Sequence, residues 1–228
     1  LNPGPFQIIS SSPERFLRVR GDTVETRPIK GTLPRGETSE QDRINGRELL
    51  QSEKNRAELA MITDLLRNDI GRVSAYGTVR VEAAASREAY TNVFHLVSIG
   101  TGRMAPGRDL TDLHRATFPG GSITGCPTIR SMEIIDKLEP TVRSVYTGSI
   151  GYIGFDGSMD LNIAIRTLIH KAKDLYYQVG GGIVFDSDPQ AEYEETLHKA
   201  ASMRVGIAST CKPRTSRTRF PADGQQGG

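Results

Sequence analysis

The chain has 228 residues, of which 36% are hydrophobic, so it can bury a core large enough for one large domain or two small ones. Its 29 basic and 27 acidic residues give a formal net charge of +2, which excludes the strong positive field of a nucleic-acid-binding protein, and no apolar run approaches the roughly 20 residues of a membrane helix. Cys126 and Cys211 form no CxxC pair, so we expect neither a disulfide framework nor a structural zinc site. So few cysteines favour a reducing compartment, and we expect a cytoplasmic location.

Short β-strands are expected in the first forty residues. Strands are predicted at Phe6–Ser11, Arg15–Arg20 and Thr23–Arg27, with a tight turn at Gly21-Asp22. Prolines 28 and 34 then interrupt the pattern, which predicts an irregular polar stretch. From about residue 41 to residue 68 apolar residues recur at helical spacing. We predict one continuous helix there, the longest in the chain, which ends before Gly71.

Strands and helices are mixed in the remainder of the chain. Strands are predicted at Thr78–Glu82, around Val93–Ile99, and at Ser149–Phe155, Leu161–Ile169 and Leu175–Val179. Helices are predicted at Asp109–Thr117, Thr128–Leu138 and about Ala191–Ile207, and the glycine-rich segment from Pro119 to Gly125 is predicted as a loop. The absence of strict βαβ alternation favours an α+β fold over a doubly wound sheet. We expect one domain over residues 1–208 and a disordered tail over 209–228.

Glutamates on two predicted helices form a candidate metal site. Glu192 and Glu195 lie three residues apart on the last helix and share a face, and Glu58 lies on the long helix. Magnesium commonly takes one or two protein carboxylates together with waters and substrate oxygens. By spacing alone, a solvated helix face is the commoner explanation of such glutamates.

Glycine-rich turns and single charged groups offer further candidates. The turns at Gly120-Gly121 and Gly180–Gly182 could present backbone N–H groups to an anion, although none matches a phosphate-loop or dinucleotide motif and a structural turn is the alternative. Arg166 lies in an apolar predicted strand, where its cation must meet either a buried carboxylate or a ligand. His95 lies between two apolar residues, as a core histidine often does. Glu14, Lys30 and Lys199 by themselves are explained as surface charges.

Eight segments follow one another in a recognisable order. They are SSPERF (11–16), RPIKGT (27–32), NRAELAMITDLLRNDIGRV (55–73), HLVS (95–98), FPGGSITG (118–125), GSIGYIG (148–154), IAIRTL (163–168) and GGGIVFDSDPQAEYEETLHKA (180–200). In this order, from about residue 5 to residue 207, they resemble the chorismate-utilising enzymes, which include anthranilate, aminodeoxychorismate, isochorismate and salicylate synthases. Eight ordered segments outweigh the structural explanations given above for single residues.

The resemblance implies a fold and a binding site. The fold would consist of layered antiparallel β-sheets flanked by helices, as in anthranilate synthase component I, and the N-terminal half that completes the sandwich and supplies pocket residues would lie outside this chain. Glu58 and Glu195 would bind Mg²⁺ directly, Glu192 would support the site, and the ion would clamp the ring carboxylate of chorismate. The implied substrate contacts are Gly31, Thr32, Thr124, Tyr146, Arg166, Gly180, Gly181, Gly182 and Lys199.

Lys30 distinguishes the branches of the family. Aminodeoxychorismate synthases read PIKGT here, as this chain does, whereas anthranilate synthases usually read PIAGT. The resemblance implies that Lys30 adds to C2 of chorismate and that Glu14 protonates the departing C4 hydroxyl, for which its pKa must be raised. Ammonia would then attack C4 and give 4-amino-4-deoxychorismate for 4-aminobenzoate and folate biosynthesis. His95 would position groups or transfer protons.

The ammonia would come from a separate glutamine amidotransferase, because no glutaminase Cys-His arrangement is visible. One departure from the family is Thr128, where a lysine is usual. Two alternatives stay open: an anthranilate synthase component I, and a chorismate-binding module without turnover.

Overall fold

The computed structural model describes residues 1–185 and 187–210, and the chain divides into two compact units, Leu1–Gln178 and Val179–Gly228. The first unit contains all ten strands and five of the helices described. The second contains α6 (Pro189–Thr210), which follows an irregular glycine-rich segment. The predicted tail lies outside the described residues from 211 onward, and the single catalytic domain expected over residues 1–208 stays a prediction.

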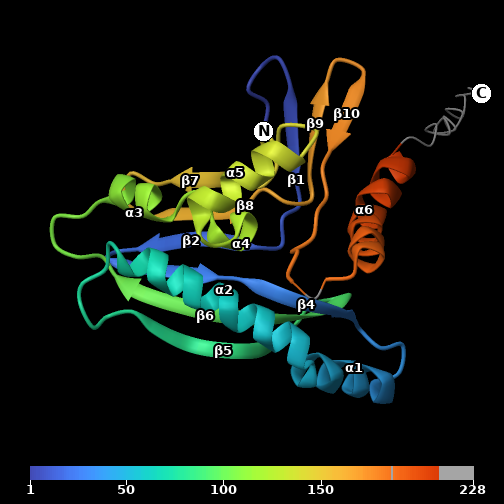
Figure 1. Ribbon diagram of the computed structural model, residues 1–228, viewed down its shortest axis with the longest axis horizontal. Coiled ribbons are helices and arrows are strands. Elements are labelled where there is room, and N and C mark those ends of the chain that lie inside the picture. Colours follow the sequence, from blue (N-terminus) through green and yellow to red (C-terminus); the bar gives the residue numbers. More distant parts are fainter. Residues whose placement is uncertain (186, 211–228) are drawn as a thin grey trace, which may run out of the picture. The chain divides into compact units, whose positions relative to one another are not determined.

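The strands of the first unit form two sheets, in which every pairing is antiparallel (Figure 1). The smaller sheet has the order β1-β9-β10, built from β1 (Gln7–Ser10), β9 (Thr167–Lys171) and β10 (Asp174–Tyr177). The seven-stranded sheet has the order β4-β6-β3-β2-β8-β7, with β5 also paired to β6. Its strands are β2 (Arg15–Arg20), β3 (Thr23–Arg27), β4 (Ile29–Pro34), β5 (Arg80–Ala89), β6 (Val93–Arg103), β7 (Ser149–Ile153) and β8 (Met159–Ile163).

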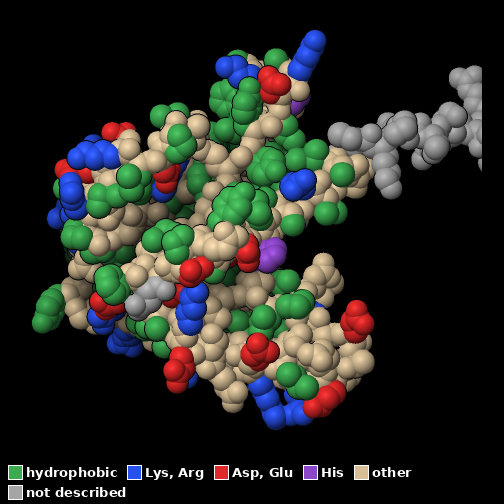
Figure 2. Space-filling model, turned by 45° about the vertical axis from the view of Figure 1, so that its right-hand side comes forward, with side chains coloured by type: hydrophobic (Ala, Val, Ile, Leu, Met, Phe, Trp, Pro, Cys, Tyr) green, Lys and Arg blue, Asp and Glu red, His purple; other side chains and the backbone are tan. Residues whose placement is uncertain are grey.

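Helices accompany the larger sheet, which confirms the α+β class. They are α1 (Ser39–Gln51), α2 (Glu53–Gly71), α3 (Leu110–Thr117), α4 (Gly121–Thr124) and α5 (Thr128–Leu138). The helix α2 lies across the larger sheet (Figure 1). None of the described helices is long and apolar enough to span a bilayer. On the face shown in Figure 2, basic and acidic side chains are interspersed without an extended field of one sign.

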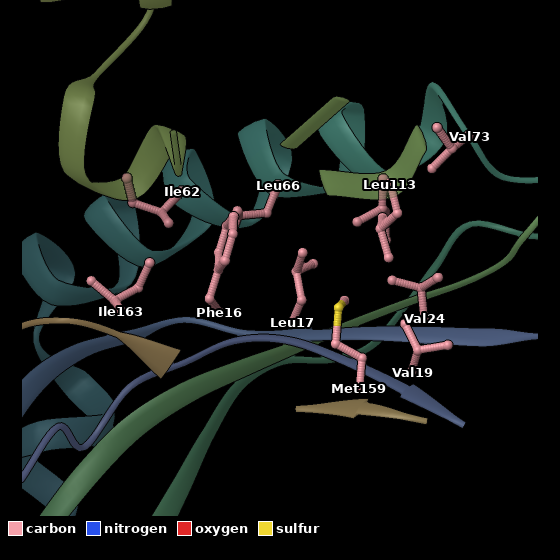
Figure 3. Close-up of a cluster of buried hydrophobic side chains, with 11 residues drawn as sticks. Phe16, Leu17, Val19, Val24, Ile62, Leu66, Val73, Leu113, Met159 and Ile163 are labelled. Atoms are coloured by element: carbon pink, nitrogen blue, oxygen red, sulfur yellow. The ribbon is translucent and has the colours of Figure 1, made fainter. Parts of the chain in front are cut away.

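The core of the first unit fixes α2 on the sheet (Figure 3). The helix contributes Ile62, Leu66 and Ile70, which recur at i, i+4 spacing. Phe16 and Leu17 are adjacent in β2 yet both are buried, because the register of β2 shifts in this region. Since α2 is packed so closely on the sheet, side chains elsewhere on the helix have fixed positions relative to the strands.

The single helix predicted from residue 41 to residue 68 is wrong, because the chain breaks at Ser52 into α1 and α2. Ser52 has an extended backbone, with ψ at 104°, and its side chain accepts a hydrogen bond from the Asn55 N–H. It therefore ends one helix and caps the next. Apolar residues have helical spacing on both sides of the break, and the polar residues 51–56 between them also suit an exposed helix face, so the spacing could not show the boundary. At 22 residues, α6 is the longest of the helices that the structure describes.

Three further predictions are also corrected. The strand predicted at Leu161–Ile169 is wrong, because β8 ends at Ile163 and β9 begins at Thr167 in the other sheet. Arg166 lies in the break with φ at 47°, a left-handed conformation that no strand contains. The stretch predicted as irregular after Pro28 forms β4, with its prolines only at the ends, where they cost little pairing. One helical turn, α4, replaces part of the loop predicted from Pro119 to Gly125.

Candidate functional site

A bulge in β4 brings Lys30 to Glu58. The Lys30 amine lies 3.9 Å from Glu58 Oε2 on α2, and the two side chains are 26% and 27% exposed. The register of β4 against β6 shifts around Gly31, whose φ is +81°. A Cβ at Gly31 would lie 2.8 Å from the Asn55 side chain of α2. Glycine therefore permits both the bulge and the close approach of β4 to α2, which sets Lys30 beside Glu58.

Glu14 is an acidic group within electrostatic reach of Lys30. Its carbonyl oxygen accepts a hydrogen bond of 3.1 Å from the Ile163 N–H at the end of β8. Burial raises the pKa of Glu14 to about 7, although the charge of Lys30 and a hydrogen bond from Ser122 act against the rise. A carboxyl with such a pKa can give up and take back a proton near neutral pH. The proton-donor role that the resemblance implies for Glu14 requires a raised pKa, and the pKa of Glu14 is raised in this structure.

Gly120 and Gly121, which directly precede Ser122, allow this segment to pack closely against the core. A Cβ at Gly121 would collide with the Leu65 side chain of α2, and one at Gly120 would lie 3.1 Å from the Phe16 ring. These glycines therefore let α4 sit close to the core, which accounts for them without a bound anion. The hydroxyl of Thr124 donates within the same turn, at 3.3 Å to the Gly120 carbonyl oxygen.

His95 is buried at 5% exposure and contacts two polar neighbours. Its Nδ1 lies 2.8 Å from the Thr32 hydroxyl, the residue directly opposite on β4, and the Tyr90 ring packs edge-on at 5.2 Å. Burial, and to a smaller extent the charge of Arg166, lower the pKa of His95. The imidazole is therefore neutral near pH 7 and can transfer a proton.

Arg166 is half-buried, and its guanidinium has no hydrogen-bond or ion-pair partner in the part of the chain that the structure describes. The buried ion pair considered as an alternative is therefore not found there. The adjoining segment, with Tyr146, is tied to the same turn, since the Thr147 N–H donates to the Ala164 carbonyl oxygen at 2.9 Å. Burial raises the pKa of Tyr146, so its phenol keeps its proton as a donor. A cation without a partner among the described residues suits a carboxylate ligand.

The second unit holds its own predicted site residues on α6 and on the preceding glycine segment. Lys199 Nζ lies 2.6 Å from Glu195 Oε1 and donates to the Gly180 carbonyl oxygen at 3.1 Å. Glu192 Oε1 accepts a hydrogen bond of 2.8 Å from the Ser187 hydroxyl. These contacts fold the glycine segment back along α6.

One carboxylate oxygen of Glu192, Oε2, is buried without a hydrogen-bond partner among the described residues, which bears on whether the predicted site residues could bind a metal ion. A Cβ at Gly181 would lie 2.8 Å from this oxygen. A carboxylate oxygen left in this state fits a divalent cation or a cation-bound water. Glu58 lies in the first unit and Glu195 in the second, and the described residues contain no group of three or more His, Cys, Asp or Glu side chains that could hold a metal. The shared ion stays a prediction.

Ser122 and Asn55 are the residues near the site that the sequence did not single out. Both lie inside the resembling segments, Ser122 directly after two glycines and Asn55 in the first turn of α2. A hydroxyl that follows two glycines was the available signal for Ser122. No pattern could indicate that Asn55 would face Gly31.

Known proteins resemble the chain over most of its length. Residues 1–205 match the sequence profile of a family described as chorismate binding enzyme. Aminodeoxychorismate synthase component 1 of Klebsiella aerogenes is 53% identical over 192 residues, which are 84% of this chain and 43% of the relative. Anthranilate synthase component 1 1 of Haloarcula marismortui is 49% identical over 212 residues, which are 89% of this chain and 43% of the relative.

A solved structure agrees with these sequence relatives. The crystal structure of anthranilate synthase component I from Streptococcus pneumoniae matches with a TM-score of 0.79 and 44% identity, over 89% of this chain and 44% of that chain. The chain spans less than half the length of each of these three proteins.

Proposed function

The chain belongs to the chorismate-binding enzyme family, and from this premise we propose that it aminates chorismate at C4 with ammonia to give 4-amino-4-deoxychorismate. The observation that carries the proposal is the Lys30 amine, which lies 3.9 Å from Glu58 and acts electrostatically on Glu14. The proposed nucleophile, Lys30, and the proposed proton donor, Glu14, both belong to the first compact unit. A branch that reads alanine at position 30 would lack the nucleophile.

The proposed reaction proceeds through a bond to Lys30. The neutral amine adds to C2 of chorismate, the ring double bonds shift, and the C4–O bond breaks as Glu14 donates its proton, so that the hydroxyl leaves as water. Ammonia then attacks C4, the double bonds shift back, and the bond to Lys30 breaks. The new amine returns a proton to the Glu14 carboxylate. Chorismate and ammonia thus give 4-amino-4-deoxychorismate and water, and both side chains return to their starting states.

Chorismate has two carboxylates, and the chain offers a separate group for each. Arg166, which lacks a partner in the described residues, and the Tyr146 phenol suit one carboxylate. Glu58 and Glu195, with Glu192 in support, would hold Mg²⁺ for the other. Such an ion neutralises the carboxylate and helps to orient the ring. Neutral His95 would position the substrate or transfer protons. Gly31, Thr32, Thr124, Gly180, Gly181, Gly182 and Lys199 would complete the contacts.

We assign this activity to the whole protein. The chain spans less than half of its relatives, and the family resemblance implies that the other half supplies pocket residues. The ammonia would come from a glutamine amidotransferase partner. The test is to incubate the full-length protein with chorismate, Mg²⁺ and ¹⁵N-ammonium and to identify the product by mass spectrometry. The proposal predicts a ¹⁵N-labelled product that retains the enolpyruvyl group.

A second function is favoured by one observation, the 49% identity to an anthranilate synthase component. That activity would give labelled anthranilate and release pyruvate without an added lyase, which would overturn the proposal. A binding module would bind chorismate in a Mg²⁺-dependent manner and leave it unchanged. The single incubation therefore separates all three functions.

A further inference from the structure

We propose that Tyr90 is a positioning residue for His95: its ring packs edge-on against the imidazole and holds it in one orientation, with Nε2 left to meet the substrate. The inference deepens the proposed function and rests on it, because His95 would position the substrate or transfer protons in that reaction. It gives a role to Tyr90, which lies outside the eight resembling segments.

Three neighbouring strands set the side chains around His95 on one face of the larger sheet. His95 of β6 is directly opposite Thr32 of β4 on one side and directly opposite Glu88 of β5 on the other. Directly opposite residues of antiparallel strands project from the same face, so these three side chains form a row across the sheet. Tyr90 comes two positions after Glu88, in the turn that joins β5 to β6. The sheet register therefore brings Tyr90 and Thr32 to the same imidazole.

Thr32 holds one ring nitrogen of His95 but does not fix the ring alone. Its hydroxyl lies 2.8 Å from Nδ1, and because a hydroxyl can donate or accept, this bond suits either tautomer of the imidazole. Rotation of a histidine ring about its second side-chain torsion meets only broad energy wells. A second contact is therefore needed to keep the ring in one orientation.

The other ring nitrogen of His95, Nε2, is the one that can meet a ligand. It has no hydrogen-bond partner in the part of the chain that the structure describes. It is also not among the buried side-chain atoms that lack a partner there, so it keeps some accessible surface although the residue as a whole is 5% exposed. An imidazole that turned over would carry this nitrogen away and would lose its bond with Thr32.

The Tyr90 ring supplies the second contact. Its centroid lies 5.2 Å from that of the imidazole, with an angle of 65° between the two planes. This edge-on arrangement is one of the two that aromatic pairs prefer, and such a pair favours its geometry over one without the contact by about two- to ten-fold. Tyr90 and Thr32 together therefore select one orientation of the His95 ring.

Tyr90 is itself held at both ends. Its phenol donates to Glu88 Oε2 at 2.9 Å, and the other carboxylate oxygen of Glu88 is paired with Arg27. At the backbone, the Tyr90 N–H donates to the Val93 carbonyl oxygen at 2.8 Å, and the Tyr90 carbonyl oxygen accepts from the Arg35 guanidinium at 3.0 Å. A ring anchored in this way can act as a rigid support for a neighbouring functional side chain.

Three substitutions in the full-length protein test the proposal by steady-state kinetics with chorismate, Mg²⁺ and ammonium. Tyr90→Leu removes the ring, Tyr90→Phe keeps it, and Tyr76→Leu is the matched control, because Tyr76 is fully exposed. Tyr90→Leu should lower kcat by about five-fold and change KM less than two-fold, since the reacting orientation of His95 becomes less populated. Tyr90→Phe should stay within about two-fold of wild type, and Tyr76→Leu should match wild type.

A double-mutant cycle shows whether Tyr90 acts through His95. In a His95→Asn background there is no imidazole to orient, so adding Tyr90→Leu should change kcat less than two-fold. Tyr90→Met fills most of the same volume without a rigid ring, and it replaces Tyr90→Leu if the leucine variant does not fold. A merely structural role of Tyr90 would lower kcat by the same factor in both backgrounds.

The ring orientation is measured without substrate, by nitrogen-15 NMR of the histidine rings in the full-length protein, with His95→Asn to assign the signals. Wild type and Tyr90→Phe should show one set of His95 signals, whereas Tyr90→Leu should show a second set or exchange broadening. Unchanged His95 signals in Tyr90→Leu, or an additive double-mutant cycle, would overturn the positioning role. A product other than 4-amino-4-deoxychorismate would contradict the proposed function, while the substrate-free spectra would still decide whether Tyr90 orients His95.

Discussion

Replacing Glu14 with glutamine removes an acid that the fold keeps protonated well above its ordinary range. The pKa of this carboxyl rises from 4.5 to about 7, chiefly through burial. Below pH 4.5 both the folded and the unfolded protein carry the proton, so Glu14 adds no pH dependence there. Between pH 4.5 and about 7 the unfolded protein loses the proton while the folded protein keeps it, so stability falls as the pH rises.

The size of this effect follows from the shift. A rise from 4.5 to about 7 corresponds, at about 1.4 kcal/mol per pKa unit, to roughly 3 kcal/mol of stability lost across this window. Glutamine cannot ionise, so Glu14→Gln is spared this loss. Any constant cost of the substitution is the same at both ends of the window. The change in the difference between variant and wild type is therefore the informative quantity.

The assay is urea unfolding of both proteins at pH 4.5 and at pH 8. The free energy of unfolding of Glu14→Gln, relative to wild type, should increase by about 3 kcal/mol between the two pH values. Other titrating groups are shared by the two proteins and cancel in the difference. A difference that is equal at both pH values would refute the reasoning, because Glu14 would then titrate alike in the folded and unfolded chains.

The remaining predictions concern three other residues of the site. Lys30→Ala should reduce formation of 4-amino-4-deoxychorismate by at least about 10³-fold while calorimetry still detects Mg²⁺-dependent chorismate binding; normal turnover would exclude the covalent role. Gly31→Ala should lower the free energy of unfolding by about 1–3 kcal/mol more than the control Gly21→Ala, because both have positive φ but only Gly31 lacks room for a Cβ; equal losses in urea unfolding would contradict the packing argument. Arg166→Ala should raise KM for chorismate about 100-fold with a change in melting temperature of only about 2 °C, and a large loss of stability would instead indicate a structural ion pair.

Local patterns predicted much of the fold. The bounds of β2, β3 and α5 match the predicted ranges, since alternation, helical spacing and turn residues specify such elements locally. Ser52 and Arg166 mark where this reasoning failed. Apolar residues have helical spacing on both sides of Ser52, and the polar residues 51–56 between them also suit an exposed helix face, so spacing could not reveal the boundary. Around Arg166 the apolar run continues, so it could not reveal the passage from one sheet to the other.

The residues of the candidate site were predicted from the order of the eight resembling segments and not from the spacing of residues within one helix or strand. Lys30 and Glu58 are 28 positions apart, and only the bulge at Gly31 shows why they meet. The raised pKa of Glu14 results from burial among distant segments, which no linear pattern contains. Glu195 belongs to the second unit, so its place beside Glu58 stays a prediction.

The most direct test of the covalent role of Lys30 is intact-protein mass spectrometry of the full-length protein after incubation with chorismate and Mg²⁺ but no ammonium. We predict a mass increase equal to chorismate less one water, located on the peptide that contains Lys30, absent from Lys30→Ala and discharged when ammonium is added. Turnover with ammonium in a protein that never acquires this adduct under the same conditions would contradict the account.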